Sequence, residues 1–168
     1  IAAHFNLAFT NSATSGPDTN DVVFGMEAAT AETIPDAARL DLAFNELASS
    51  TNGSFWLELI NRGSAPANLA GCIIARFGGT NREFALPPEL LAPGALREVS
   101  KAELGFGVDS GNRLVLYSPG RSNVLDAVVA KKEPRGRRPD GSGSWLFPSA
   151  PTPGASNAVV LRDELVIN

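Results

Sequence analysis

Short segments with the alternation of β-strands recur between turn-forming residues along most of the chain after Arg39. The predicted strands cover residues 40–47, 55–61, 69–77, 82–86, 95–100, 112–118 and 123–129. Helical periodicity is confined to residues 34–40 and 101–104. Because short connections between successive strands favour antiparallel pairing, this pattern predicts an all-β protein built as an antiparallel β-sandwich.

The segment FWLELIN, residues 55–61, indicates which side of a strand faces the core. Its odd-numbered side chains are all apolar up to residue 59, whereas its even-numbered side chains are mixed. Since successive side chains of a strand point to opposite faces, the odd-numbered set is predicted to be core. Residues 78–81 (GGTN) predict a hairpin turn, and residues 119–120 (PG) begin the turn between the last two predicted strands.

Composition sets limits on the class of protein. The 168 residues are 43% hydrophobic, which is enough to bury a core. No apolar run approaches the roughly 20 residues of a membrane-spanning helix, so no membrane insertion is predicted. The net charge of −4 supplies no chain-wide field for nucleic acid or anionic lipid. Cys72 is the only cysteine, which excludes a disulfide or a thiolate zinc site within this chain.

The chain divides into three predicted parts. Residues 1–38 contain two segments that alternate like strands, and they form either an N-terminal β extension or the end of a preceding domain. Residues 39–158 form the sandwich, and residues 159–168 form a linker and the start of a following module. The terminal LVIN repeats the pattern of LAFN at residues 42–45. Because the chain opens at Ile1 without a signal-peptide pattern and stops within a predicted strand, both ends are interpreted as cuts from a multidomain protein.

Residues 135–157 have almost no periodic apolar side chains. They contain a basic start, the turn dipeptides Asp140-Gly141 and Pro153-Gly154, and one tryptophan. The expected structure is a long surface loop that begins where the β body ends.

Seven segments of the chain form an ordered pattern: LAFNEL (42–47), FWLELIN (55–61), ANLAGCIIA (67–75), FALPPELLAPGAL (84–96), LGFGVDSGNRLVLYSPG (104–120), VLDAVV (124–129) and GRRPDGSGSW…PTPGASN (136–157). In this order, and with the ending GR-x-PDG…W…PTPG-x-x-N, they resemble the lamin-tail domain family over about residues 39–158. The resemblance implies an immunoglobulin-like β-sandwich. It also implies an interaction module of the kind found in nuclear lamins and in bacterial surface and secreted proteins.

One position departs from the family pattern. Cys72 stands where the family commonly has a tryptophan, after the Leu-x-Gly of residues 69–71. No coiled-coil heptads are present, so the chain is not a nuclear intermediate filament. The resemblance is therefore to the bacterial-type members, which implies an extracellular or cell-envelope location.

Residues capable of catalysis are few. His4 is the only histidine and lies outside the predicted sandwich, and Cys72 lies in an apolar strand, so a nucleophile with an imidazole base is hard to build. Glu46 and Glu58 lie on the first two predicted strands and could approach each other as a carboxylate pair. The alternative is a structural role, in which each lies at a sheet face or bonds a loop amide. We expect this structural role and no enzymatic activity.

Calcium is the most plausible metal to test. Asp109, Asn112, Asp126 and Asp140 offer oxygen ligands in loops or at strand ends, but their spacing fits no EF-hand loop. The other interpretation is that they form turns by bonding nearby backbone. We predict no metal site and no cofactor. The sequence does not decide whether a structural calcium binds near Asp109 or Asp140.

One charge cluster stands out, with a local net charge of +4 over residues 131–138. The candidate ligand-binding residues are Lys131, Lys132, Arg135 and Arg138, together with Trp145. Guanidinium and ammonium groups could bind phosphate, sulfated glycan or an acidic partner while the indole stacks on a sugar or base. The alternative is that the arginines bond carbonyls and carboxylates to hold a loop. We expect Arg137 and Trp145 to be structural and Lys131, Lys132 and Arg135 to be freer.

These observations predict a non-catalytic adhesion or scaffolding module of a larger secreted or cell-surface bacterial protein. Its partner would be a protein or glycan at the cell surface, besides neighbouring domains of its own chain. Two alternatives stay open. The module could bind a polyanion, nucleic acid or sulfated glycan, through residues 131–138, or it could be an accessory part of a multidomain hydrolase.

Overall fold

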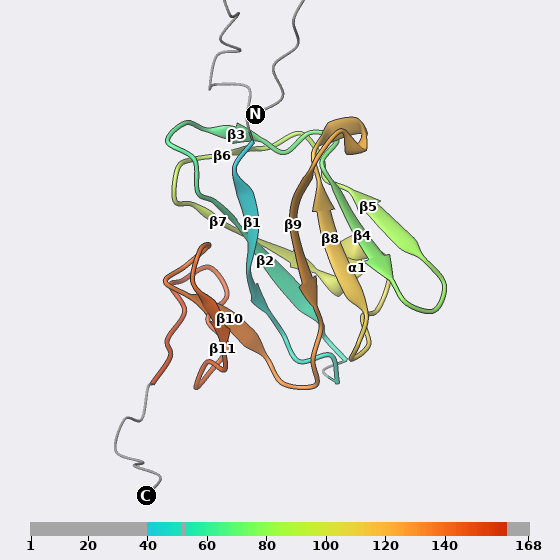
Figure 1. The fold of residues 1–168 in the computed structure, drawn as a ribbon, viewed down its shortest axis with the longest axis vertical. Coiled ribbons are helices and arrows are strands. Elements are labelled where there is room, and N and C mark those ends of the chain that lie inside the picture. Colours follow the sequence, from blue (N-terminus) through green and yellow to red (C-terminus); the bar gives the residue numbers. More distant parts are fainter. Residues whose placement is uncertain (1–39, 52, 161–168) are drawn as a thin grey trace, which may run out of the picture. The chain divides into compact units, whose positions relative to one another are not determined.

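The computed structural model describes residues 40–51 and 53–160 of the chain (Figure 1). These residues belong to one compact unit, Arg39–Asn168. The predicted N-terminal β extension, including His4, lies outside the described residues, as does the predicted start of a following module at residues 161–168.

Two antiparallel sheets pack against each other around one core (Figure 1). The larger sheet has the order β11-β10-β1-β2-β7, with bounds Ser144–Leu146, Arg135–Arg138, Leu42–Leu47, Trp56–Asn61 and Leu96–Ser100. The smaller sheet has the order β5-β4-β8-β9, with bounds Arg82–Ala85, Ile73–Phe77, Arg113–Tyr117 and Val124–Val129. The short strands β3 (Ala67–Asn68) and β6 (Leu90–Leu91) pair separately. The predicted all-β antiparallel sandwich is confirmed, an architecture that immunoglobulin-like domains share.

The core lies between the two sheets and follows the alternation of the strands. Leu57 and Leu59 on β2 and Leu114 and Leu116 on β8 belong to one core cluster, and all four are 0% exposed. The predicted core face of residues 55–61 is therefore confirmed. Each such side chain contributes about 1.5 to 3 kcal/mol by its removal from water.

Local signals account for the one α-helix of the described residues, α1 (Lys101–Leu104), which was predicted at this place. Ser100 Oγ accepts a hydrogen bond from the Glu103 N–H at 3.2 Å and so caps the first turn. Gly105 ends the helix in the left-handed conformation, with φ 72°, which glycine adopts without strain.

Both predicted turns are present. Gly78 and Gly79, with φ 110° and 70°, connect β4 to β5 as a hairpin. The 3-10 turn η2 (Pro119–Arg121) connects β8 to β9, and Gly120 within it has φ 64°. The positive φ angles explain why glycine stands at these positions.

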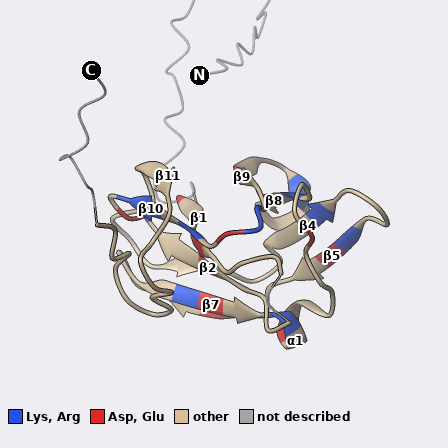
Figure 2. Cartoon of the chain, turned by 90° about the horizontal axis from the view of Figure 1, so that it is seen from below, with Lys and Arg blue, Asp and Glu red and all other residues tan. Residues whose placement is uncertain are grey.

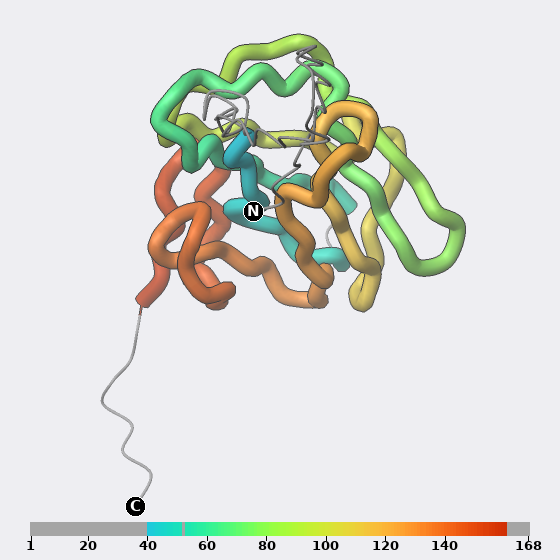
Figure 3. The backbone as a smooth tube through the Cα atoms, turned by 45° about the horizontal axis from the view of Figure 1, so that its top comes forward, coloured from blue at the N-terminus to red at the C-terminus, as the bar shows by residue number. Residues whose placement is uncertain are grey.

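Residues 135–157 differ from the predicted surface loop. β10 and β11 extend the larger sheet beyond β1, and Figure 3 shows this part of the chain as the orange-to-red tube. The chain then returns to β1 and β2, where the Thr152 and Gly154 N–H groups donate to Glu46 and Glu58. The prediction that the β body ends before this segment is wrong. β10 reads RGRR, and its side chains make charge and stacking contacts where a core strand would have apolar ones. Its sequence therefore lacks the apolar alternation that reveals a strand. We call residues 139–157 the C-terminal strap; it includes β11.

A bulge in β1 directs two consecutive polar side chains toward this strap. Phe44 pairs with Leu59 and Glu46 pairs with Glu58, so Asn45 is the extra residue between them. A bulge redirects the side chains next to it. Asn45 and Glu46 are both 0% exposed and bond outward to the strap, although they are neighbours in the sequence.

Candidate functional site

Lys131 and Lys132 lie in the connection from β9 to β10, and both are exposed. Their backbone is fixed, because Ser50 N–H donates to Lys131 O at 3.2 Å and the Ser49 hydroxyl donates to Lys132 O. Figure 2 shows this connection and β10 as a run of blue broken by red. Neither lysine joins an ion pair among the described residues. Their ammonium groups are therefore available to an anionic partner.

Strand alternation separates the arginines of β10. Arg135 and Arg137 share one face, where their guanidinium carbons lie 5.5 and 4.7 Å from the centroid of the Trp145 ring. Arg138 is on the other face and donates to Asn157 O at 3.2 Å. The structure thus brings Trp145 to Arg135 but not to Arg138.

Arg137 joins the two sheets. Its Nη2 donates to both carboxylate oxygens of Asp126 on β9, at 3.1 and 3.0 Å, and its Nε donates to Phe44 O at 3.0 Å. The Phe44 N–H donates to Asp126 Oδ2 at 3.0 Å. Both charged side chains are only 15% exposed. Trp145 covers the guanidinium and packs against the core, so Arg137 and Trp145 have the structural contacts expected for them.

Glu46 and Glu58 face each other across β1 and β2 and are 0% exposed. Glu46 accepts hydrogen bonds from the Thr152 N–H at 3.1 Å and the Thr152 hydroxyl at 2.8 Å. Glu58 accepts from Gly154 N–H at 2.6 Å and Asn45 Nδ2 at 2.9 Å. The two carboxylates therefore hold the C-terminal strap, which is the loop-amide role considered for them.

Burial is the main cause that raises the pKa of both Glu46 and Glu58, and the hydrogen bonds that each accepts oppose it. Repulsion from Asp140 raises both pKa values further. Among the described residues no cation forms an ion pair with either carboxylate. A raised pKa is also found in catalytic acids, but glycoside hydrolysis needs carboxyl groups that a substrate can reach. The strap closes this pair from solvent.

Asn157, for which no role is predicted from the sequence, completes the attachment of the strap. It is 2% exposed, and its Nδ2 donates to Asn45 O, Arg137 O and Asp140 Oδ1 at 3.2, 3.0 and 3.0 Å. Gly136 makes room for it, since a Cβ there would lie 2.6 Å from Asn157 Cγ. Only the asparagine at the end of the family-like PTPG-x-x-N pattern hinted at this contact.

Three of the four side chains considered for calcium, those of Asn112, Asp126 and Asp140, have other partners. Asn112 Oδ1 accepts from Asp109 N–H at 2.9 Å, which is the turn-forming role expected of Asn112. Asp140 Oδ1 accepts from Asn157 N–H at 3.1 Å, and Asp126 binds Arg137. Within residues 40–51 and 53–160, no group of three or more His, Cys, Asp or Glu side chains could hold a metal ion.

Cys72 is 0% exposed and packs in the core. Burial raises the pKa of its thiol, so the neutral form is favoured. A buried protonated thiol is neither a good nucleophile nor a good metal ligand, and Cys72 therefore acts as the small apolar residue expected of it.

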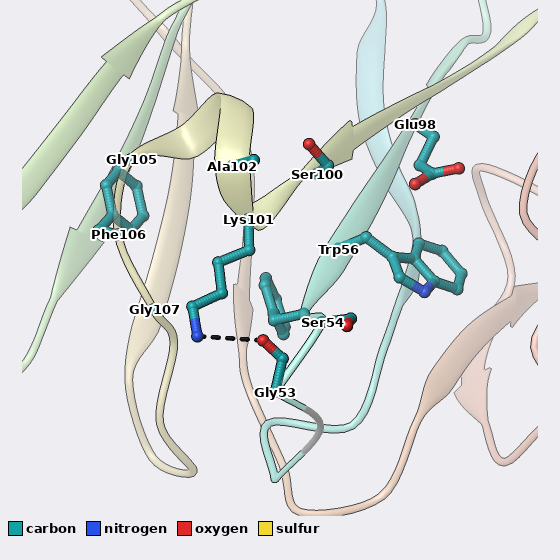
Figure 4. A pocket seen from close by; sticks show the side chains of 11 residues that line it. Gly53, Ser54, Trp56, Glu98, Ser100, Lys101, Ala102, Gly105, Phe106 and Gly107 are labelled. Carbon is teal, nitrogen blue, oxygen red and sulfur yellow. Dashed lines mark hydrogen bonds between the residues drawn. The ribbon is translucent and has the colours of Figure 1, made fainter.

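A groove of about 720 Å³ opens beside the start of α1 (Figure 4). It is lined by Gly53, Ser54, Phe55, Trp56, Glu98, Ser100, Lys101, Ala102, Gly105, Phe106 and Gly107. Lys101 Nζ donates to Gly53 O at 3.1 Å and so connects α1 to the β1–β2 loop. No sequence pattern predicts this groove, because its residues come from three separate segments and form no motif.

Comparison of the sequence with protein-family models and with curated proteins gives no match in either case. No helix in the described part of the chain is long and apolar enough to cross a membrane. A functional assignment thus depends on the geometry of these surfaces and on the sequence pattern.

Proposed function

We propose that the sandwich is a lamin-tail-like, non-catalytic interaction module of a larger secreted or cell-surface bacterial protein, acting in adhesion or scaffolding. Its binding surface is the end of the sandwich formed by the β1–β2 loop, by α1 with the following residues, and by the β9–β10 connection. We call this surface the loop end. Its partner is a protein or glycan of the cell envelope.

One observation carries this proposal: backbone hydrogen bonds join the three parts of the loop end into one surface. Lys101 N–H donates to Phe55 O at 2.8 Å, and Ser50 N–H donates to Lys131 O at 3.2 Å. Gly111 N–H donates to Ala130 O at 2.9 Å. Loops held in this way lose little conformational entropy when a partner binds, which favours recognition.

The positions of the reactive groups also support a binding role. Glu46 and Glu58 accept amides of the strap, Asp126 binds Arg137, and Cys72 lies in the core. Each group therefore has a structural task away from the loop end. The surface that is left for partners consists of backbone, aromatic rings and exposed charges, which is typical of recognition rather than catalysis.

Polyanion binding is the second candidate, and the exposed lysine pair favours it. Lys131 and Lys132 extend from a fixed backbone beside Arg135, so phosphate or sulfate groups could meet several cations at once. Glu133 within the same connection weakens this field. A protein or glycan partner is therefore favoured over nucleic acid.

Sedimentation with purified bacterial cell envelopes tests the leading proposal. The 168-residue chain is expected to sediment with the envelopes, and Lys132→Glu at the loop end is expected to reduce the bound fraction. Asn123→Glu is the control, because Asn123 is exposed and follows η2 at the opposite end of β8 and β9. Equal loss in both variants, or no sedimentation of the wild-type chain, contradicts the proposal.

Heparin chromatography tests the second candidate. Retention that falls steeply with salt and is lost in the Lys131→Ala, Lys132→Ala, Arg135→Ala triple variant would establish polyanion binding. Elution at low salt of both the wild-type chain and the triple variant excludes polyanion binding.

A further inference from the structure

The groove beside α1 has the size and composition of a ligand site. Its volume of about 720 Å³ lies within the range of about 300 to 1,000 Å³ for small-molecule sites. Phe55 and Phe106, 2% and 9% exposed, belong to its lining, and the half-buried Trp56 adds an indole ring (Figure 4). Three of its lining residues are glycines, which add no side chains to the groove.

Two opposite charges flank this groove. Trp56 pairs with Ser100 and Glu58 with Glu98, so Trp56 and Glu98 occupy neighbouring positions on the same face of β2 and β7. The Glu98 side chain lies beside the indole in Figure 4 and joins no ion pair among the described residues. Lys101 stands on the other side, at the first position of α1.

The polar groups define the chemistry of the ligand. One N–H of the Lys101 ammonium donates to Gly53 O, which leaves two donors for a ligand, and the Glu98 carboxylate can only accept. A ligand with a net charge of either sign would be attracted by one of these two residues and repelled by the other. A hydroxyl group both donates and accepts, so a neutral ligand with several hydroxyls satisfies both residues without an uncompensated charge.

We propose that the groove binds a neutral oligosaccharide, with the apolar C–H face of one sugar ring on the indole of Trp56. Glu98 accepts hydrogen bonds from sugar hydroxyls, and Lys101 donates to them. Trp56 supplies a rigid apolar surface of the kind that dominates binding sites. This inference rests on the proposed binding function and names its ligand class.

Tryptophan fluorescence can report ligand binding in the groove, because Trp56 lines it and the chain has only one other tryptophan. Trp145→Phe leaves Trp56 as the only indole and keeps a ring beneath Arg135 and Arg137. Titration of this variant with cellohexaose and with the hexamer of N-acetylglucosamine is expected to change the Trp56 emission saturably with at least one of them. A heparin-derived hexasaccharide is expected to cause no such change.

Calorimetry with the sugar that binds assigns the roles. Trp56→Ala is expected to weaken affinity about tenfold or more, since stacking on an aromatic ring contributes on that order. Glu98→Gln, on an exposed side chain that need not affect folding, is expected to weaken it about fivefold. Phe147→Ala removes an exposed ring, 64% accessible, outside the groove and is the control.

Three results overturn the inference: no saturable change of Trp56 emission with either neutral sugar, a change with the heparin fragment alone, or equal losses in Glu98→Gln and Phe147→Ala. Envelope sedimentation that persists without sugar binding leaves the binding module standing with a protein partner. Sugar binding without envelope sedimentation supports the groove as a sugar site and contradicts binding to the cell envelope. The two proposals therefore fail separately.

Discussion

Replacing Glu58 by Gln tests whether the strap depends on a buried carboxylate that accepts two hydrogen bonds. Its Oε1 accepts from Asn45 Nδ2 at 2.9 Å and its Oε2 from Gly154 N–H at 2.6 Å. A glutamine has one carbonyl oxygen, so its NH₂ group must face one of these donors. A flip of the Asn45 amide, which would turn its oxygen to the glutamine NH₂ group, would break the hydrogen bond that Asn45 Oδ1 accepts from Gly141 N–H at 2.8 Å.

The expected loss follows from one donor left without an acceptor. An unsatisfied buried group costs about 1 to 3 kcal/mol, and removal of a buried charge near Glu46 and Asp140 offsets part of this. We therefore expect Glu58→Gln to lower the free energy of unfolding by about 1 to 2 kcal/mol at neutral pH.

Glu46→Gln is the matched control, because one of the two donors to Glu46 is the Thr152 hydroxyl, which can also accept a hydrogen bond. The glutamine carbonyl can accept from Thr152 N–H, and the NH₂ group can donate to the Thr152 hydroxyl. That hydroxyl can then turn its proton to Asn157 Oδ1, which lies 3.4 Å away. No donor is left unsatisfied, so the expected loss is below about 1 kcal/mol.

The same variants report the pH dependence. Folding raises the pKa of both carboxyl groups above their usual value of 4.5, so the folded protein binds these protons more tightly than the unfolded chain. Their contribution to stability is fully present below about pH 4.5 and is lost as the pH rises through the folded-state pKa. Relative to the wild type, each glutamine variant should therefore lose more stability at pH 5 than at pH 8.

Urea unfolding followed by tryptophan fluorescence and circular dichroism at pH 5 and pH 8 measures these differences. Coincident transitions from the two probes are needed for a two-state free energy. Equal losses of stability in Glu46→Gln and Glu58→Gln, or losses that grow toward pH 8, would contradict this role of the two carboxyl groups.

Three further predictions concern the core, the junction of the sheets and one glycine. Leu59→Ala should lower the free energy of unfolding by about 2 to 5 kcal/mol in urea, and a loss below about 1 kcal/mol would contradict its place in the core. Arg137→Lys should cost about 1 to 3 kcal/mol, because an ammonium group cannot reach both oxygens of Asp126 and Phe44 O; unchanged stability in the same assay would show that these bonds are dispensable. Gly143→Ala should lower the melting temperature strongly, since a Cβ there overlaps the Arg138 carbonyl, whereas Gly53→Ala, with nothing within 4 Å of the added Cβ, should not; similar melting temperatures would exclude the overlap.

The strands of the two sheets could be predicted where one face of a strand is apolar. β2 and β8 each place leucines at alternate positions, and these leucines are buried. The caps of α1 could be predicted because Ser100 and Gly105 act within one turn of the chain. Such signals depend on neighbours in the sequence, and they set the class of the fold.

The candidate surfaces could be predicted only in part. The charge of residues 131–138 is evident from the sequence, but the division of Arg135 and Arg138 between two faces appears only when β10 pairs with β1 and β11. The groove beside α1 escaped prediction because Trp56, Glu98 and Lys101 have no common motif. Their proximity results from the pairing of β2 with β7 and the turn into α1.

Local patterns of residues are enough to predict the period of the strands, the positions of the turns and the supply of apolar side chains for one core. Which polar side chains are buried, and what they bind, depends on contacts between distant parts of the chain. Asn157 donates to Asn45 O across 112 positions of the chain, and Thr152 donates to Glu46 across 106. A polar residue carries no local signal of such a partner, because its burial is favourable only once the distant donor or acceptor is in place.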